Sequence, residues 1–143
     1  NIIPLGRPGS MMQVKECLDR GEVVGILADR IYADEATQAV PFLGSLARFS
    51  MSPLRLARMT GAPVVTVFGL FHGANRYEIV FESLVTRVDD VSCSQAADAA
   101  SAPAATDNTV SLQDCLAAYV AILERHARRC PYNWFNFYDY WSK

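Results

Sequence analysis

Two short apolar runs, at residues 22–28 and 62–71, most constrain how this chain can fold. Each run is bounded by glycine or polar residues and has the length of a β-strand that is covered on both faces. Met11, Val14 and Leu18 share one helical face before the first run, and an isoleucine pair before them resembles the end of another strand. Strand, helix and strand in this order predict a parallel crossover unit. We therefore expect an α/β fold with a partly parallel, mixed sheet that is flanked by helices.

Four elements, of which the second apolar run is one, follow from the spacing of apolar and turn-forming residues. They are a helix at residues 54–60, strands at 62–71 and 77–82 joined as a hairpin, and a helix at 110–129. Ser52 and Pro53 favour the start of the helix at residues 54–60. Ser111 and Asp114 form a capping pair for the last helix.

The composition is that of a single globular domain, with 143 residues of which 51% are hydrophobic and 20% charged. Within it, the alanine-rich residues 94–109 lack a helical apolar stripe, and we predict a flexible surface loop there. Residues 131–143 form an aromatic tail that holds seven of the fifteen aromatic side chains. We expect this tail to pack in the core or at an interface.

The first residues of the chain suggest a piece of a longer domain. The sequence starts at Asn1 rather than at methionine, and a β-branched pair follows directly. We interpret residues 1–143 as a C-terminal portion that is incomplete at the N-terminus. A sheet interrupted there leaves apolar surface uncovered, which predicts self-association.

The charge balance and the cysteines argue against several classes of function. Thirteen Lys and Arg stand against fifteen Asp and Glu, so no general basic field holds a nucleic-acid backbone. The apolar runs are shorter than the ~20 residues that cross a bilayer. None of the four cysteines forms a pair at metal-binding spacing, and we expect no metal site; they are Cys17, Cys93, Cys115 and Cys130.

Asp29 and Arg30 directly follow the first apolar run, at the start of a stretch that we predict as a loop through residue 44. In open α/β sheets, ligands bind beyond the carboxyl ends of the strands. An acid beside a base at that point is suited to hold a polar headgroup. A plain solvated pair of charges is an equal alternative on position alone.

Other basic residues each allow a functional and a structural interpretation. Arg48, Arg55 and Arg58 form a local basic cluster that is suited to lipid phosphates, whereas unpaired surface arginines are also ordinary. His72 and His126 have no nucleophile tied to them by spacing. We predict structural or solvated roles for both histidines rather than catalysis.

Three motifs in a fixed order resemble a known family. Residues 25–30 read GILADR, residues 40–48 read VPFLGSLAR and residues 56–64 read LARMTGAPV. Together they resemble the second half of the bacterial lipid A biosynthesis (lauroyl/myristoyl) acyltransferases, which belong to the lysophospholipid acyltransferase superfamily. The resemblance extends from about residue 2 to residue 81 and returns at residues 131–141.

This resemblance implies an acyltransferase-like fold and activity. A fatty acyl group would pass from acyl carrier protein or acyl-CoA to a hydroxyl of a lipid or glycolipid acceptor. The place implied for this reaction is the cytoplasmic face of the bacterial inner membrane, to which the chain would attach peripherally. The thioester donor is a substrate, and no bound cofactor is expected.

The resemblance also implies roles for particular residues. Asp29 matches an acidic position in the block that holds the acceptor, and Arg30 accompanies it. The other acceptor-side residues are Phe42 and Gly44, a pair that shapes the wall of the same site, and Arg48. Four side chains are expected to face the membrane: Arg55, Arg58, Trp134 and Trp141.

The chain departs from the family in its histidines. The family's catalytic dyad is a histidine with an acid five positions later, in which the histidine takes the hydroxyl proton. Tyr77 and Pro131 stand five positions after His72 and His126. We therefore assign no catalytic residue, and expect an inactive acceptor-side half whose dyad lies upstream. The alternative is a non-catalytic lipid- or partner-binding α/β module.

Overall fold

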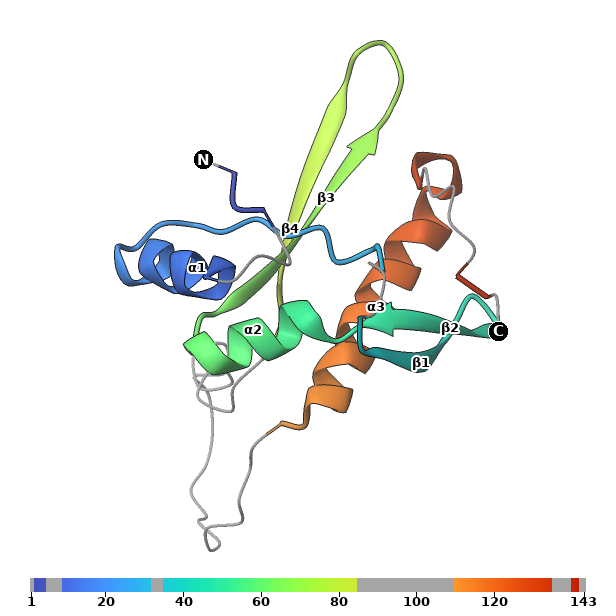
Figure 1. The fold of residues 1–143 in the computed structure, drawn as a ribbon. Coiled ribbons are helices and arrows are strands. Elements are labelled where there is room, and N and C mark those ends of the chain that lie inside the picture. The colour runs from blue at the N-terminus through green and yellow to red at the C-terminus, as the bar shows by residue number, and fades with distance from the viewer. Residues whose placement is uncertain (1, 5–8, 32–34, 85–109, 135–139, 142–143) are drawn as a thin grey trace, which may run out of the picture.

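A computed structural model describes residues 2–4, 9–31, 35–84, 110–134 and 140–141 (Figure 1). The elements in chain order are α1 (Ser10–Asp19), β1 (Thr37–Phe42), β2 (Ser45–Ser50), α2 (Ser52–Thr60), β3 (Val64–Phe71), β4 (Tyr77–Leu84), α3 (Leu112–Arg129) and η2 (Pro131–Asn133), a single 3₁₀ turn. The expected combination of helices and strands is confirmed. The alanine-rich stretch at residues 94–109 lies outside the described residues.

Both sheets in the described part of the chain are two-stranded and antiparallel. The predicted hairpin of the second apolar run is confirmed as β3 and β4, which pair from Val64↔Leu84 to Phe71↔Tyr77. The expected partly parallel, mixed sheet is not confirmed. Residues 22–28 form no strand, and Val23 is 97% exposed. The physical reason is that an apolar run specifies a surface to be covered but not which strand will pair with it.

Strand β1 of the first hairpin lies in the stretch that the sequence predicted as a loop, and its partner β2 lies in a stretch for which no element was predicted. A two-residue turn joins its strands, with φ of 51° at Leu43 and 91° at Gly44. A turn with two positive φ values matches the twist of a hairpin, and Asn-Gly is its usual signal. Leucine gives no such signal, which explains why the hairpin was missed. The Leu43 backbone N–H also donates to Oε2 of Glu124 at 3.2 Å, which holds the turn against α3.

The helix ends follow the capping residues. The Ser111 hydroxyl accepts a hydrogen bond from the Asp114 backbone N–H at 3.0 Å, as the capping pair predicts. Helix α2 carries Pro53 in its first turn and ends at Gly61, whose φ of 67° places it in the left-handed conformation. Both helices therefore begin and end close to the predicted positions.

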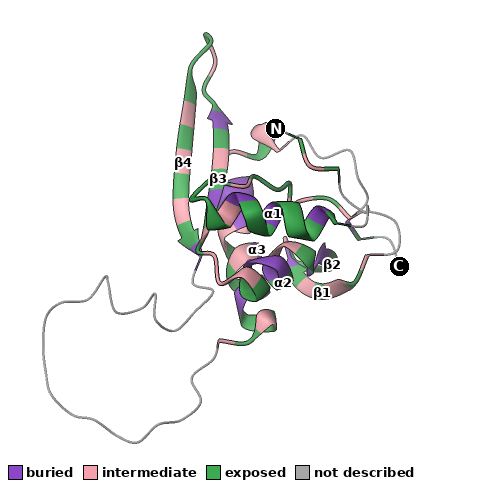
Figure 2. Cartoon of the chain, turned by 60° about the vertical axis from the view of Figure 1, so that its left-hand side comes forward, coloured by how far each residue is buried: buried purple, intermediate pink, exposed green. Residues whose placement is uncertain are grey.

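The core lies where α3 packs against the first hairpin (Figure 2). Its largest fully buried side chains are Tyr140, Phe42, Phe49, Leu116 and Val120. Rings from β1, β2 and the tail meet edge to face or tilted, with centroids 5.4 Å apart for Phe42 and Phe49 and 5.3 Å apart for Phe49 and Tyr140. The described part of the aromatic tail thus contributes to the core at Tyr140, while Tyr132 is 92% exposed.

Candidate functional site

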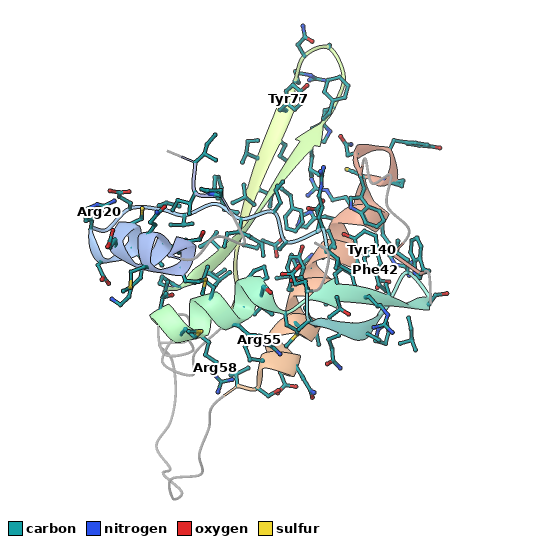
Figure 3. The ribbon with its side chains drawn as sticks, viewed as in Figure 1. Arg20, Phe42, Arg55, Arg58, Tyr77 and Tyr140 are labelled. Atoms are coloured by element: carbon teal, nitrogen blue, oxygen red, sulfur yellow. The ribbon has the colours of Figure 1, made fainter. Side chains whose placement is uncertain are left out.

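Tyr140 brings three of the predicted acceptor-side residues together. Its hydroxyl donates a hydrogen bond to the backbone carbonyl of Asp29, and its own carbonyl accepts one from the Arg48 backbone N–H at 3.2 Å. Its ring lies 6.2 Å from that of Phe42, and Figure 3 shows both side chains on one side of α3. Segments far apart in the sequence therefore meet at one buried tyrosine, which sequence reasoning treated only as part of the tail.

The Asp29 carboxylate lies at the edge of this aromatic cluster. Asp29 is half-buried, and none of the ion pairs among the described residues includes it. The Asp29 charge also acts on Tyr119 of α3. Burial, and then the Asp29 carboxylate, raise the pKa of the Tyr119 hydroxyl. The carboxylate thus has a fixed backbone, an aromatic neighbour and access to solvent.

The other acceptor-side candidates differ in what they offer a ligand. Phe42 has 0% exposure, so its ring supports the residues of the site and does not form a wall that a ligand could contact. Gly44 is exposed in the turn of the first hairpin. Arg48 is exposed on β2, where its guanidinium donates to the Thr37 hydroxyl at 3.3 Å. Arg30 is exposed, and no described residue forms an ion pair with it.

The four residues expected to face a membrane do not form one surface. Arg55 and Arg58 are exposed on α2, and Figure 3 shows them side by side near the N-terminal half of α3. Trp134 is half-buried and meets the Phe42 ring edge to face at 5.2 Å. Trp141 stacks on the same ring at 6.2 Å and is 42% exposed. The two tryptophans thus pack on Phe42 in the core of the first hairpin, whereas the two arginines lie on α2.

A row of ion pairs between β4 and α3 was not found by sequence reasoning. Glu82 accepts hydrogen bonds from Nε2 of His126 at 2.5 Å and from Arg125. Four residues earlier on the same face of β4, Glu78 pairs with Arg129 at 3.1 Å. We call this set of pairs the β4–α3 seam.

The hydrogen bonds of the seam stabilise the ionised carboxylates. The bond from His126, and then that from Arg125, lowers the pKa of Glu82. A bond from His72 at 2.8 Å, followed by that from Arg129, lowers the pKa of Glu78. The signal in the sequence was acids four apart on a strand and basic residues four apart on a helix, which place each set on one face. The local sequence of β4 or of α3 does not show that these two faces pack against each other.

Both histidines are therefore engaged with carboxylates of β4. His126 is 5% exposed, and its ring stacks on Phe68 with centroids 4.3 Å apart. A small pocket beside it has a volume of about 60 Å³. Sites for drug-sized ligands run from roughly 300 Å³ upward, so this pocket is too small for a fatty acyl chain.

Two features are absent from the part of the chain that the structure describes. No helix there is both long and apolar enough to cross a membrane. No three side chains of His, Cys, Asp or Glu gather there as ligands for a metal ion.

These features describe an α/β protein with an accessible carboxylate that is supported by an aromatic core. Comparison with known proteins assigns the chain to a family. A sequence model of the bacterial lipid A biosynthesis acyltransferases matches residues 3–142. The chain belongs to this family. No curated protein and no solved structure matches it.

Proposed function

We propose that this chain is the acceptor-binding half of an acyltransferase that moves a fatty acyl group from acyl carrier protein or acyl-CoA to a hydroxyl of a lipid or glycolipid. One observation carries the proposal: the Asp29 carboxylate is accessible, without an ion-pair partner in the described residues, on a backbone that Tyr140 holds. An ionised carboxylate only accepts hydrogen bonds, so hydroxyl groups are its natural partners. Arg30 and Arg48 supply exposed positive charge in the segments that flank it, which suits the phosphates of a glycolipid.

The first test is the affinity for the acceptor. Asp29→Asn keeps the shape of the side chain and removes its charge, and hydrogen bonds to charged groups contribute about 1.5–3 kcal/mol. We expect roughly 10- to 100-fold weaker binding of a lipid A precursor in detergent micelles, measured by isothermal titration calorimetry. Asp19→Asn is the matched control, since Asp19 is exposed on α1 in an ion pair with Lys15. Equal affinity of the Asp29 variant and the wild type would contradict the proposal.

The second test concerns the membrane surface, which we propose is that of the cytoplasmic leaflet. Each Arg near an anionic bilayer contributes about 1 kcal/mol, so a double Arg55→Gln and Arg58→Gln variant should bind anionic vesicles roughly 30-fold more weakly. Vesicle co-sedimentation measures this. The control is the double variant Lys15→Gln and Arg20→Gln, which removes the same charge from α1 and from the residue that caps it, Arg20 (Figure 3). An equal loss in both variants would show that the arginines of α2 have no special part.

A second candidate function is a non-catalytic lipid- or partner-binding module. It is favoured by the lack of the family's dyad in these 143 residues, since Tyr77 and Pro131 stand five positions after His72 and His126. The two candidates share the acceptor site and differ in the reaction. Both predict no acyl transfer by these 143 residues alone, so acyl transfer by the longer protein that the first candidate requires distinguishes the two.

A further inference from the structure

The outer face of the hairpin of β3 and β4 is apolar and uncharged over its whole length. The strand register places four cross-strand pairs on it: Val65↔Ser83, Val67↔Phe81, Gly69↔Ile79 and Phe71↔Tyr77. Its six large apolar side chains are each between 42% and 69% exposed. Monomeric proteins seldom expose so continuous an apolar surface without a partner for it. We call this surface the hairpin face.

The opposite face of the same hairpin is already occupied. Thr66, Leu70 and Leu84 are buried there, and Glu78 and Glu82 form the β4–α3 seam. Successive residues of a strand point to opposite faces, so these contacts fix which set of side chains faces outward. The hairpin cannot turn its apolar side chains inward without breaking the seam.

The hairpin also projects from the rest of the chain, although Asn133 of η2 hydrogen-bonds to the Phe71 backbone at its outer end. Figures 1 and 2 show its outer half extending beyond the helices, with exposed and half-buried residues alternating along β4. Within the described residues its sheet has two strands and hence two open edges. Apart from the backbone groups of Phe71, which Asn133 binds, burial in a bilayer would leave the edge backbone groups of both strands without partners, which is costly in hydrocarbon. A protein surface is the better cover.

We propose that a second copy of this chain covers the hairpin face, so that the two hairpins stack face to face about a two-fold axis. The face carries no charge, so its contact with an identical copy buries no unpaired ion. At about 100 Å² for each half-exposed large side chain, the six present on the order of 600 Å² per copy, close to the ≈ 800 Å² of a standard interface.

The two-fold arrangement also fits the shape of the face. Its centre is low, because Gly69 has no side chain and the Cδ1 atom of Ile79 lies 3.7 Å from where a Cβ atom of Gly69 would stand. One end is high, with the rings of Phe71 and Tyr77, whereas the other end carries the smaller side chains of Val65 and Ser83. An axis through the centre lays the aromatic end of one copy over the opposite end of its partner. Stacked sheets of this kind lie about 10 Å apart.

Sedimentation equilibrium of the full 143-residue chain tests the proposal. We expect a mass that rises toward twice the 15.8 kDa of one chain below ~100 µM. The double variant Ile79→Glu and Phe81→Glu should weaken the dimer at least ~100-fold, because it buries two carboxylates per copy. The control Val23→Glu and Leu27→Glu makes the same change at exposed positions outside the face and should leave the dimer intact.

A second measurement keeps the test independent of how well the Glu variant folds. Ile79→Cys places a thiol close to the proposed axis, so a bifunctional maleimide whose spacer matches the distance between the sheets should cross-link a chain to its own copy through position 79, as peptide mapping would show. A wild type that stays monomeric at ~100 µM would overturn the proposal. So would a dimer that the Glu variant leaves unchanged, or a monomer that binds vesicles through Ile79 and Phe81.

Discussion

Replacing Phe42 with alanine should lower the free energy of unfolding by about 3–5 kcal/mol, the range for the removal of a large buried side chain. Phe42 has 0% exposure, and its ring meets Phe49, Trp134, Tyr140 and Trp141. The substitution leaves a cavity between the first hairpin and the tail that none of these rings can fill without moving. Because domains are stable by only about 5–15 kcal/mol, a large part of the total would be lost.

Urea unfolding followed by circular dichroism measures this loss. Tyr132→Ala is the control, since it removes an aromatic ring that is 92% exposed and should change the stability by no more than about 0.5 kcal/mol. Phe42→Ala should also weaken acceptor binding, because the Phe42 ring supports Tyr140, which holds the backbone of Asp29. A Phe42 variant as stable as the wild type would show that the aromatic cluster is not the core of this protein.

Removal of the Glu82 carboxylate should have the second-largest effect, a loss of about 2 kcal/mol at neutral pH in Glu82→Ala. His126 is buried, and its Nε2 atom would lose its partner, as would Arg125 of the same helix. The β4–α3 seam would then be held chiefly by Glu78, whose side chain is 39% exposed. The measurement is again urea unfolding, with Glu16→Ala on the exposed side of α1 as the control.

The seam also predicts how stability depends on pH. The pKa of Glu82 is lowered below its ordinary value of 4.5, so the folded chain binds fewer protons there than the unfolded chain does. The stabilisation is present above pH 4.5 and is lost as the pH falls through the lowered pKa. Glu82→Gln should therefore flatten the loss of stability between neutral pH and about pH 3, relative to the wild type. Parallel curves for the two proteins would contradict the role of the seam.

The sequence predicted the elements whose signals are local. The hairpin of β3 and β4 follows from the alternation of Tyr77, Ile79 and Phe81 with acidic residues, and the start of α3 follows from Ser111. The first hairpin was missed because Leu43 occupies a turn position that usually holds asparagine or glycine. Residues 22–28 were predicted as a strand because an apolar run can be recognised from the local sequence alone. A strand also needs a neighbouring strand to pair with, which the local sequence does not show.

The candidate site, like the fold, could be predicted only where its signals are local in the sequence. Asp29 was singled out by its place after an apolar run and by the family resemblance. Its contact with Tyr140 joins residues 111 positions apart, and the seam joins Glu82 to His126 across 44 positions. Spacing along a helix or strand shows which residues share a face, but tertiary packing decides which faces meet.

The central claim is that this chain binds the acceptor without supplying the chemistry of acyl transfer. The most direct measurement incubates the 143-residue chain with an acyl-CoA or an acylated carrier protein and with a lipid A precursor at a concentration that saturates binding. We predict precursor binding that depends on Asp29 and no acylated product above the background without protein, because neither histidine has the family's acid five positions later. Acylated product that rises in proportion to the concentration of the chain would contradict this account.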